Sequence, residues 1–402
     1  MIGAAVALAV ALTAAPPSAA APASLPALAK PHGVGSPARA GASEPRLAAT
    51  ADGALLMTWL EPAGGVTALR VASLRESKWS AAATVVQSDS LVQSWPNLAG
   101  ACAFGAHGVA VAWPERAGAT ERLRIALSKD GGATWGKAAI LHDDREGSTH
   151  GFVSLLPQGE GVRAIWLDGH NLKDGLEEGA APMTLHSRFI APTGTLALEQ
   201  ELDGRVCDCC WIGVAPLGDE LLVAYRDRSD DEIRDIAVTR LESGRWQPPY
   251  GPRYDGWKLK GCPVNGPAIA TRGDRVAVAW YTAAADSPRV LTAFSNDRGW
   301  TFGDAIRVDD GHPLGRVGLA LLDDGGAAVT WLEGDRSRST LRVRRLKPGA
   351  RSSTSTEIAR FDGPHTPGVP QLARDRDRLL FAWTQAGKAQ AIQVASLPVP
   401  RP

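Results

Sequence analysis

The sequence predicts an all-β fold, a β-propeller built from four-stranded antiparallel blades. Three observations support this. An aromatic residue recurs every 51 to 59 residues, near the end of an apolar run that is rich in β-branched residues. A polar or acidic turn follows each run, and shorter alternating runs flank it on both sides. The recurring aromatic positions are Trp59, Trp113, Trp166, Tyr225, Trp280, Trp331 and Trp383.

The strands of one repeat can be assigned in order from the first unit. Residues 45–56 (PRLAATADGALL) read as a short first strand, a Gly/Asp turn and the start of the aromatic-bearing second strand. The alternating run 69–74 (LRVASL) reads as a third strand, and 78–86 (KWSAAATVV) as a fourth. Four-stranded units that repeat and stack around an axis are typical of a propeller. We expect each recurring aromatic to pack against the next blade.

Seven aromatic positions favour seven blades, with six blades and irregular ends as the alternative. The last repeat, 369–398, lacks a fourth strand, which the segment before Pro45 is available to supply. We therefore divide the chain into a signal peptide (1–21), a Pro/Ala-rich linker (22–43) that is available to close the ring, and a propeller (44–402).

The N-terminal run is apolar and ends in small residues near Ala19 to Ala21, which predicts a secretory signal, although no Lys or Arg precedes the run. We expect a periplasmic or secreted protein, in a compartment where disulfides persist. No later segment has the roughly 18 uninterrupted apolar residues that a transmembrane helix needs. Lys plus Arg and Asp plus Glu are 43 each. This balance argues against a general nucleic-acid binder, which needs surplus positive charge.

Two turns between third and fourth strands share one pattern. Ser128 to Trp135 reads SKDGGATW and Ser295 to Phe302 reads SNDRGWTF, and both fit S-x-D-x-G-x-T-W/F. This pattern resembles the Asp-box (BNR repeat) of the sialidase superfamily. The resemblance implies a sialidase-like propeller in which these boxes are structural turns on the face away from the active site. The carboxylate accepts hydrogen bonds within the turn, and the glycine takes the tight backbone.

The resemblance also implies a site, since sialidases clamp the substrate carboxylate with three arginines and use a tyrosine nucleophile. The chain departs from this pattern: Ser43 occupies the first clamp position, and no tyrosine follows the last candidate arginine. Arg46 lies one residue beyond the motif proline, so we expect it on the opposite face of its strand. The candidates for the clamp and the nucleophile are Arg226, Arg228, Arg316 and Tyr281.

In a propeller, the linkers into the first strands and the turns after the second strands open on one end of the channel. Polar and aromatic residues in these segments are expected to meet a glycan or small-molecule ligand at the channel mouth. Carboxylates there could serve an inverting or retaining glycosidase. The acid/base candidates are Asp168, Asp227, Asp230 and Glu333. The substrate-binding candidates are Trp95, His150, Trp211 and Asn265.

The cysteines are few and concentrated. Three of five lie in the stretch RVCDCCWIGV, where the fourth blade begins, and a fourth opens the fifth blade in GCPVNGP. Adjacent blades bring these thiols together, as disulfides, as redox-active thiols, or as a copper or zinc site completed by His150 or His170. The candidate metal ligands are Cys207, Cys209, Cys210 and Cys262. The isolated Cys102 is expected to be buried, and His32, His107 and His142 to lie on the surface.

Three functions follow from these residues. The first is a glycan-directed protein, either a divergent glycoside hydrolase of the exo-alpha-sialidase type or a carbohydrate-binding protein. The second is a cell-envelope propeller that binds copper or zinc through the cysteine cluster. The third is an interaction scaffold in which the cysteines form structural disulfides.

Overall fold

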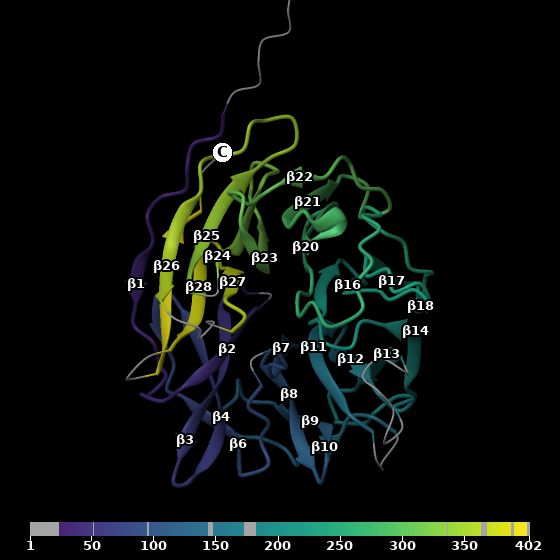
Figure 1. Cartoon of the computed structure of the whole chain (residues 1–402). Helices are drawn as coiled ribbons and strands as arrows, with labels where there is room; N and C mark the ends of the chain where they lie inside the picture. Colours follow the sequence, from purple (N-terminus) through teal and green to yellow (C-terminus); the bar gives the residue numbers. More distant parts are fainter. Residues whose placement is uncertain are drawn as a thin grey trace, which may run out of the picture.

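The computed structural model describes residues 24–50, 52–94, 96–143, 148–172, 182–335, 337–362, 368–386 and 390–399. The strands of these segments form seven antiparallel sheets arranged in a ring (Figure 1). The seven-bladed propeller is therefore confirmed, and the alternative of six blades is wrong. The predicted signal peptide lies outside the described residues. Within the described segments, no helix is both long enough and apolar enough to span a membrane.

Blades 1 to 4 follow the chain, each running from the innermost strand outward. Blade 1 comprises β2 (Ser43–Ala49), β3 (Leu55–Ala63), β4 (Val66–Arg75), and an outer strand in two pieces, β5 (Lys78–Trp79) and β6 (Ala83–Ser88). Blade 2 comprises β7 (Gly100–Phe104), β8 (Gly108–Ala117), β9 (Thr120–Ser128) and β10 (Ala139–Ile140). Blade 3 comprises β11 (His150–Gln158), β12 (Gly161–Asp168), β13 (Met183–Ile190) and β14 (Gln200–Val206). Blade 4 comprises β15 (Gly213–Leu217), β16 (Glu220–Arg226), β17 (Ile236–Glu242) and β18 (Arg245–Trp246).

Blades 5 to 7 complete the ring. Blade 5 comprises β19 (Ala268–Arg272), β20 (Arg275–Thr282), the short 3-10 helix η1 (Ala284–Asp286), β21 (Arg289–Ser295) and β22 (Ile306–Arg307). Blade 6 comprises β23 (Pro313–Leu321), β24 (Ala327–Gly334), β25 (Arg338–Leu346) and β26 (Thr356–Asp362). Blade 7 comprises β27 (Gln371–Arg374), β28 (Arg378–Gln385), β29 (Ala391–Pro398) and, as its outer strand, β1 (His32–Val34).

The ring closes between the two ends of the chain. Innermost strands contact their neighbours in sequence around the axis, and β2 of blade 1 contacts β27 of blade 7. The outer strand of blade 7 comes from the N-terminal segment, since His32 pairs with Ser396 and Val34 with Val394. In Figure 1 this purple segment runs beside the yellow C-terminal blade. A segment near the start of the described residues and the last strand are thus held in one sheet.

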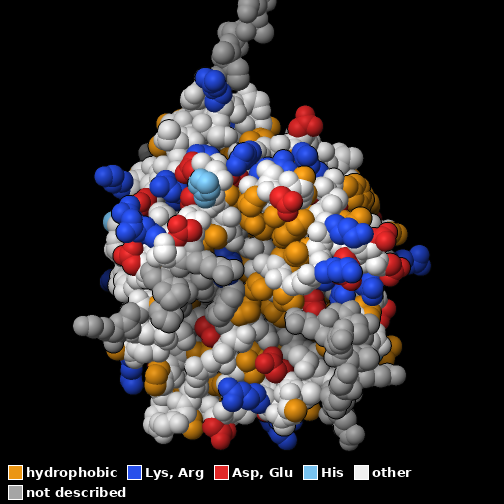
Figure 2. All heavy atoms as spheres, viewed as in Figure 1, with side chains coloured by type: hydrophobic (Ala, Val, Ile, Leu, Met, Phe, Trp, Pro, Cys, Tyr) orange, Lys and Arg blue, Asp and Glu red, His pale blue; other side chains and the backbone are white. Residues whose placement is uncertain are grey.

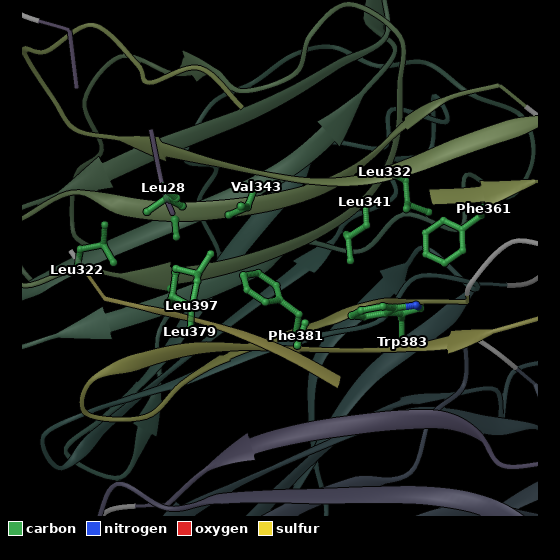
Figure 3. Packing of buried hydrophobic residues seen from close by; sticks show 13 residues of the cluster. Leu28, Leu322, Leu332, Leu341, Val343, Phe361, Leu379, Phe381, Trp383 and Leu397 are labelled. Carbon is green, nitrogen blue, oxygen red and sulfur yellow. The ribbon is translucent and has the colours of Figure 1, made fainter. Parts of the chain in front are cut away.

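The core consists of apolar clusters between neighbouring blades. Each of the seven recurring aromatics lies in one of these clusters and is at most 7% exposed. Trp383 of blade 7, for example, packs with Leu332 and Leu341 of blade 6, and Leu28 of the N-terminal segment joins the same cluster (Figure 3). The expected packing direction is therefore corrected, because each anchor faces the preceding blade. Burial of one such side chain contributes roughly 1.5–3 kcal/mol.

Several anchors also share a polar partner that the sequence analysis did not assign. The indole N–H of the anchor donates to an acidic side chain two residues later, on the same face of the strand. A buried donor without an acceptor would cost about 1–3 kcal/mol, so the acid stabilises the anchor. The pairs are Trp59–Glu61 (2.8 Å), Trp166–Asp168 (2.9 Å) and Trp331–Glu333 (2.5 Å).

The two Asp-boxes form the same turn. In the first, Asp130 accepts from the Ser128 hydroxyl at 2.7 Å and from the Thr134 backbone N–H at 2.8 Å. In the second, Asp297 accepts from Ser295 at 2.6 Å and from the backbone N–H of Thr301 at 3.0 Å. These contacts hold the pKa of both aspartates at about 2. Because strands alternate in direction, these turns lie at the end opposite the linkers that enter each blade.

Three innermost strands carry a bulge near their first residues. Glu44, Phe152 and Arg316 have positive φ values of 57°, 55° and 59°, where the pairing register shifts. A bulge inserts one residue and re-aims the side chains around it. In β2 it overturns our expectation for Arg46, whose Nη2 donates to Ser154 Oγ of β11 at 2.9 Å. Since β11 belongs to blade 3, this guanidinium reaches past blade 2 inside the ring.

Candidate functional site

The site residues predicted from sequence gather at one end of the ring wherever the structure describes them. They lie in linkers that enter first strands or near the ends of second strands, and antiparallel pairing puts these segments at the same end. Trp95 lies outside the described residues. We call this end the rim. Its residues form an apolar plug, a histidine cluster, a charged stretch and a thiol cluster, with Glu333 lying apart in blade 6.

The plug is an apolar cluster near the axis of the ring. Leu98, Trp211 and Val369 form one buried cluster, with Phe152 packed against it. These residues precede or begin the innermost strands of blades 2, 4, 7 and 3, which are not all neighbours, so they can meet only near the axis. Hydrophobic side chains also gather near the centre of the face in Figure 2. Trp211 is only 8% exposed, so it acts here as a packing residue.

A histidine cluster occupies the rim of blade 3. It consists of Asp168, at the end of β12, and four histidines around it. The Asp168 carboxylate lies 3.1 Å from His150 Nε2, 2.7 Å from His170 Nδ1 and 3.9 Å from His186 Nδ1. His142 stacks on His150 with ring centroids 3.7 Å apart. His142 is only 6% exposed, which corrects our expectation that it lies on the surface.

The electrostatics of the cluster favour an ionised Asp168 carboxylate. Burial raises the pKa of Asp168, but hydrogen bonding and charge from His150, charge from His186 and the Trp166 indole outweigh it. Its pKa therefore lies well below the ordinary value. Burial lowers the pKa of His186, but the Glu199 carboxylate, 2.6 Å away, and Asp168 reverse this effect. The pKa of His186 is raised as a result.

His170 is the member of the cluster that reaches solvent. Its side chain is 35% exposed, whereas Asp168 is 1% exposed. With Nδ1 directed at the carboxylate, the other ring nitrogen is oriented for proton transfer, which is how a buried aspartate prepares a catalytic histidine. The same atoms can also hold a metal, because ligand atoms of Asp168, His170 and His186 lie within 4.8 Å of one another.

The charged stretch of blade 4 is mostly structural. The buried Arg226 guanidinium donates to the carbonyl oxygens of Asn265 (2.8 and 3.0 Å), Arg234 (2.5 Å) and Tyr281 (2.8 Å). The Arg226 guanidinium therefore links blade 4 to blade 5, and its N–H groups are used by main-chain carbonyls. Arg228 pairs with Glu232 at 2.7 Å.

Three further candidates differ in their surroundings. Asp227 has its pKa raised to about 6 by burial and by the neighbouring Asp203 and Asp235 carboxylates. Asp230 is 98% exposed and pairs with Arg205 at 3.2 Å. Burial also raises the pKa of Tyr281, whose ring packs edge-on against Trp257.

Glu333 lines a hollow of about 720 Å³ on the surface of blade 6. Besides the Trp331 indole, its carboxylate accepts the backbone N–H groups of Asp310 (3.1 Å) and His312. Its oxygens are therefore engaged in holding the anchor and the entry of blade 6, which favours a structural role.

A thiol cluster lies where blades 3, 4 and 5 meet the rim. None of the five cysteines is part of a disulfide, and Cys102, in β7, is buried as predicted. Cys207 Sγ is 3.5 Å from Cys210 Sγ and 3.9 Å from Cys209 Sγ. Cys262 Sγ lies 3.9 Å from Asp208 Oδ1. The linkers at the starts of blades 4 and 5 thus bring the four predicted thiols to one region.

Asn265 connects the thiol cluster to blade 6. Its backbone N–H donates to Cys210 Sγ at 3.4 Å, and its Oδ1 accepts the backbone N–H of Arg316 at 2.8 Å. Gly315 permits this approach, since a Cβ there would lie 2.1 Å from Asn265 Oδ1. Arg316 itself donates to the carbonyl of Gly368 at 3.0 Å, and burial lowers its pKa to about 10. Asn265 therefore serves as a structural link.

Sequence reasoning missed His170 and His186 as members of one cluster with Asp168, although it named His170 as a possible metal ligand. The sequence did contain one signal for this cluster. Asp168 lies two residues after the anchor Trp166, and His170 lies two residues after Asp168. The antiparallel pairing of Trp166 with His186 could not be read before the register of blade 3 was known.

No family model matches the chain, and neither does any curated protein sequence. Solved structures do resemble it. An ulvan lyase of polysaccharide lyase family PL25 has a TM-score of 0.59 at 11% identity, over 91% of this chain and 96% of that one. The same enzyme type was also solved with a bound GlcA(1-4)Rha3S oligosaccharide. The NanB sialidase from Streptococcus pneumoniae has a TM-score of 0.50 at 10% identity, over 86% and 83%. At these identities the likeness shows a shared propeller fold.

Proposed function

We propose that this protein acts on a glycan at the rim, with His170 as the group that transfers the proton. The observation that supports this is the pairing of an exposed imidazole with a buried carboxylate, His170 Nδ1 being 2.7 Å from Asp168 Oδ1. The carboxylate fixes the tautomer, so that Nε2 is left to take or give a proton. The fold, shared with sialidases and polysaccharide lyases, supports a carbohydrate substrate by analogy.

The arrangement favours elimination over sialoside hydrolysis. A sialidase needs free arginine forks for its substrate, and the fork of Arg226 is filled by main-chain carbonyls. A glycosidase of the usual kind needs two available carboxylates, whereas Asp168 and Glu333 accept indole hydrogen bonds. A histidine base suits removal of the C5 proton of a uronic acid residue. The C4–O bond then breaks, and the departing oxygen takes up a proton.

The test is a panel of acidic polysaccharides and sialosides incubated with the full chain. Elimination yields an unsaturated uronate that absorbs in the ultraviolet, whereas hydrolysis yields reducing ends without that absorbance. We expect ultraviolet-absorbing product from a uronate-containing polysaccharide. We also expect a loss of about 100-fold or more in kcat for His170→Gln, as for removal of a general base.

A matched control is His107→Gln, because His107 is exposed in the β7–β8 turn, at the opposite end of the ring. This variant should keep full activity. Unchanged turnover in His170→Gln would reject the assigned base. Hydrolysis of sialosides without any elimination product would reject the reaction type. Loss of wild-type activity on chelation, restored by added metal, would assign Asp168, His170 and His186 to a metal instead.

A further inference from the structure

We propose that Cys207, Cys209 and Cys210 form a three-thiolate site for a soft metal ion, copper(I), which enters through the exposed Cys262. This site lies on the linkers into blades 4 and 5 and is separate from the histidine cluster of blade 3. It adds a metal-binding activity that does not depend on the proposed glycan function.

The spacing of the sulfurs supports a metal site. Cys207 Sγ lies 3.5 Å from Cys210 Sγ and 3.9 Å from Cys209 Sγ, and all three sulfurs lie within 4.8 Å of one another. A metal–sulfur bond of about 2.3 Å places the ligands of one ion about 3.8 Å apart in a tetrahedral shell and about 4.0 Å apart in a trigonal one. A disulfide would instead require the two atoms to approach to about 2.05 Å. The three sulfurs are therefore spaced like ligands around one ion.

The backbone holds these thiols before any ion arrives. The Cys207 N–H donates to the carbonyl of Arg226 at 3.0 Å, just beyond the bridge between Val206 and Asp227. Cys210 Sγ accepts the N–H of Asn265 from the next blade at 3.4 Å. The loop is therefore fixed at both ends by the propeller, which limits the ordering that metal binding would require.

The surroundings suit anionic sulfur. Arg234 is 2% exposed, and its Nη1 donates to Cys207 Sγ at 3.2 Å. The same guanidinium is anchored by Glu232 at 2.8 Å and by Asp208 at 3.4 Å. Three thiolates around a monovalent ion keep two negative charges, which a buried guanidinium helps to balance. Outer contacts of this kind orient and stabilise metal ligands.

The number of ligands favours copper(I) over zinc. Structural zinc sites are almost always four-coordinate and closed, whereas soft thiolates also select copper(I). The fourth thiol, Cys262, groups with Cys209 and Asp208 rather than with Cys207 and Cys210. Cys209 is thus shared by an inner group and an outer group. Exposure increases from the buried Cys207 and Cys210 through the half-buried Cys209 to the exposed Cys262, which gives the ion a path inward.

The experiment is a copper(I) titration of the reduced full chain under anaerobic conditions, against a chromophoric copper(I) chelator, with a parallel titration by zinc. We expect one tightly bound copper(I) per chain with a three-sulfur shell by X-ray absorption. Cys207→Ser and Cys210→Ser should lose stoichiometric binding, and Cys262→Ser should slow loading but keep the stoichiometry. The matched control is Cys102→Ala, since this buried thiol lies in β7, outside the cluster.

A measurement on the wild-type chain keeps the test independent of variant folding. Bound copper should protect three thiols from alkylation, and mass spectrometry of the peptides identifies which ones. Protection of Cys207, Cys209 and Cys210 supports the site. Any one of three results would overturn it: one zinc ion held by four sulfurs including Cys262, unchanged copper affinity in Cys207→Ser, or alkylation of all three thiols in the presence of copper. His170→Gln should bind copper like the wild type, so this proposal and the glycan proposal fail separately.

Discussion

The buried carboxyl of Glu44 makes the stability of the propeller depend on pH, which can be tested directly. The bulge in β2 places this residue in a left-handed conformation before Pro45, with its N–H donating to Thr384 Oγ1 of blade 7 at 3.0 Å. Burial raises the pKa of its carboxyl from 4.5 to about 8, although the Ser94 backbone N–H partly opposes the shift. Between these pH values the folded state holds a proton that the unfolded state has released. Stability should therefore fall as pH rises from 4.5 to about 8.

The magnitude follows from the shift. One pKa unit corresponds to about 1.4 kcal/mol, so the shift from 4.5 to about 8 sets an upper limit of about 5 kcal/mol. Solvent reaches part of this side chain and screens its charge, so we expect about 2 kcal/mol to be observed. Glu44→Gln keeps an acceptor for Ser94 and removes the charge. The variant should therefore be about 2 kcal/mol more stable than the wild type at pH 9 and nearly equal to it at pH 4.5.

The assay is urea denaturation of both proteins at pH values from 4.5 to 9. Glu76→Gln is the matched control, because Glu76 also has a positive φ, 46°, but is exposed. This control isolates burial from backbone conformation, and its stability should follow that of the wild type at every pH. The reasoning is refuted if the difference between Glu44→Gln and the wild type does not grow with pH.

Three further predictions concern stability. Ser295→Ala removes the acceptor of the Gly299 N–H inside an Asp-box, and we expect a loss of about 1–2 kcal/mol in urea denaturation; an unchanged midpoint would contradict the structural role of the box. Arg226→Met leaves three main-chain carbonyls without their donor, so a loss of about 3 kcal/mol is expected, and a loss below 1 kcal/mol would show that the tie to blade 5 matters little. Glu333→Gln keeps an acceptor for Trp331 whereas Glu333→Leu does not, so only the leucine variant should lose about 1–3 kcal/mol. Loss of glycan activity in the glutamine variant with normal stability would return Glu333 to the catalytic candidates.

The blade pattern was predictable because it is local. An apolar run, an aromatic and a turn recur within each 50-residue unit, and strand chemistry depends on near neighbours. The segment before Pro45 could also be matched to blade 7, because that repeat lacks a strand. The direction in which Trp383 packs could not be predicted, since an aromatic in a strand buried on both faces can turn toward either neighbour. Only the assembled core places it against Leu332.

The site was less predictable, because it depends on register and on single inserted residues. The repeat spacing predicted that the linkers carrying Cys207 and Cys262 enter adjacent blades, and the structure shows these linkers side by side. The sequence could not show the bulge near Glu44. The rule that side chains alternate between the two faces of a strand therefore gave the wrong face for Arg46. A bulge has no strong sequence signal when its left-handed residue is not glycine. The pairing of His186 with Trp166, and hence the histidine cluster, likewise required a known register.

The apolar plug near the axis bears on the kind of substrate that the rim can accept. Leu98, Trp211 and Val369 form a buried apolar cluster at the centre, and such side chains suit the hydroxyl groups of a single terminal sugar poorly. His170 follows β12, the second strand of blade 3, where an extended chain that crosses the rim can contact neighbouring blades as well. An internal bond of a polymer is therefore the expected target, and kcat/KM should rise with chain length across oligosaccharides of one polymer. Equal kcat/KM for a disaccharide and a long chain would contradict this reasoning, because binding energy from remote sugars would then contribute nothing.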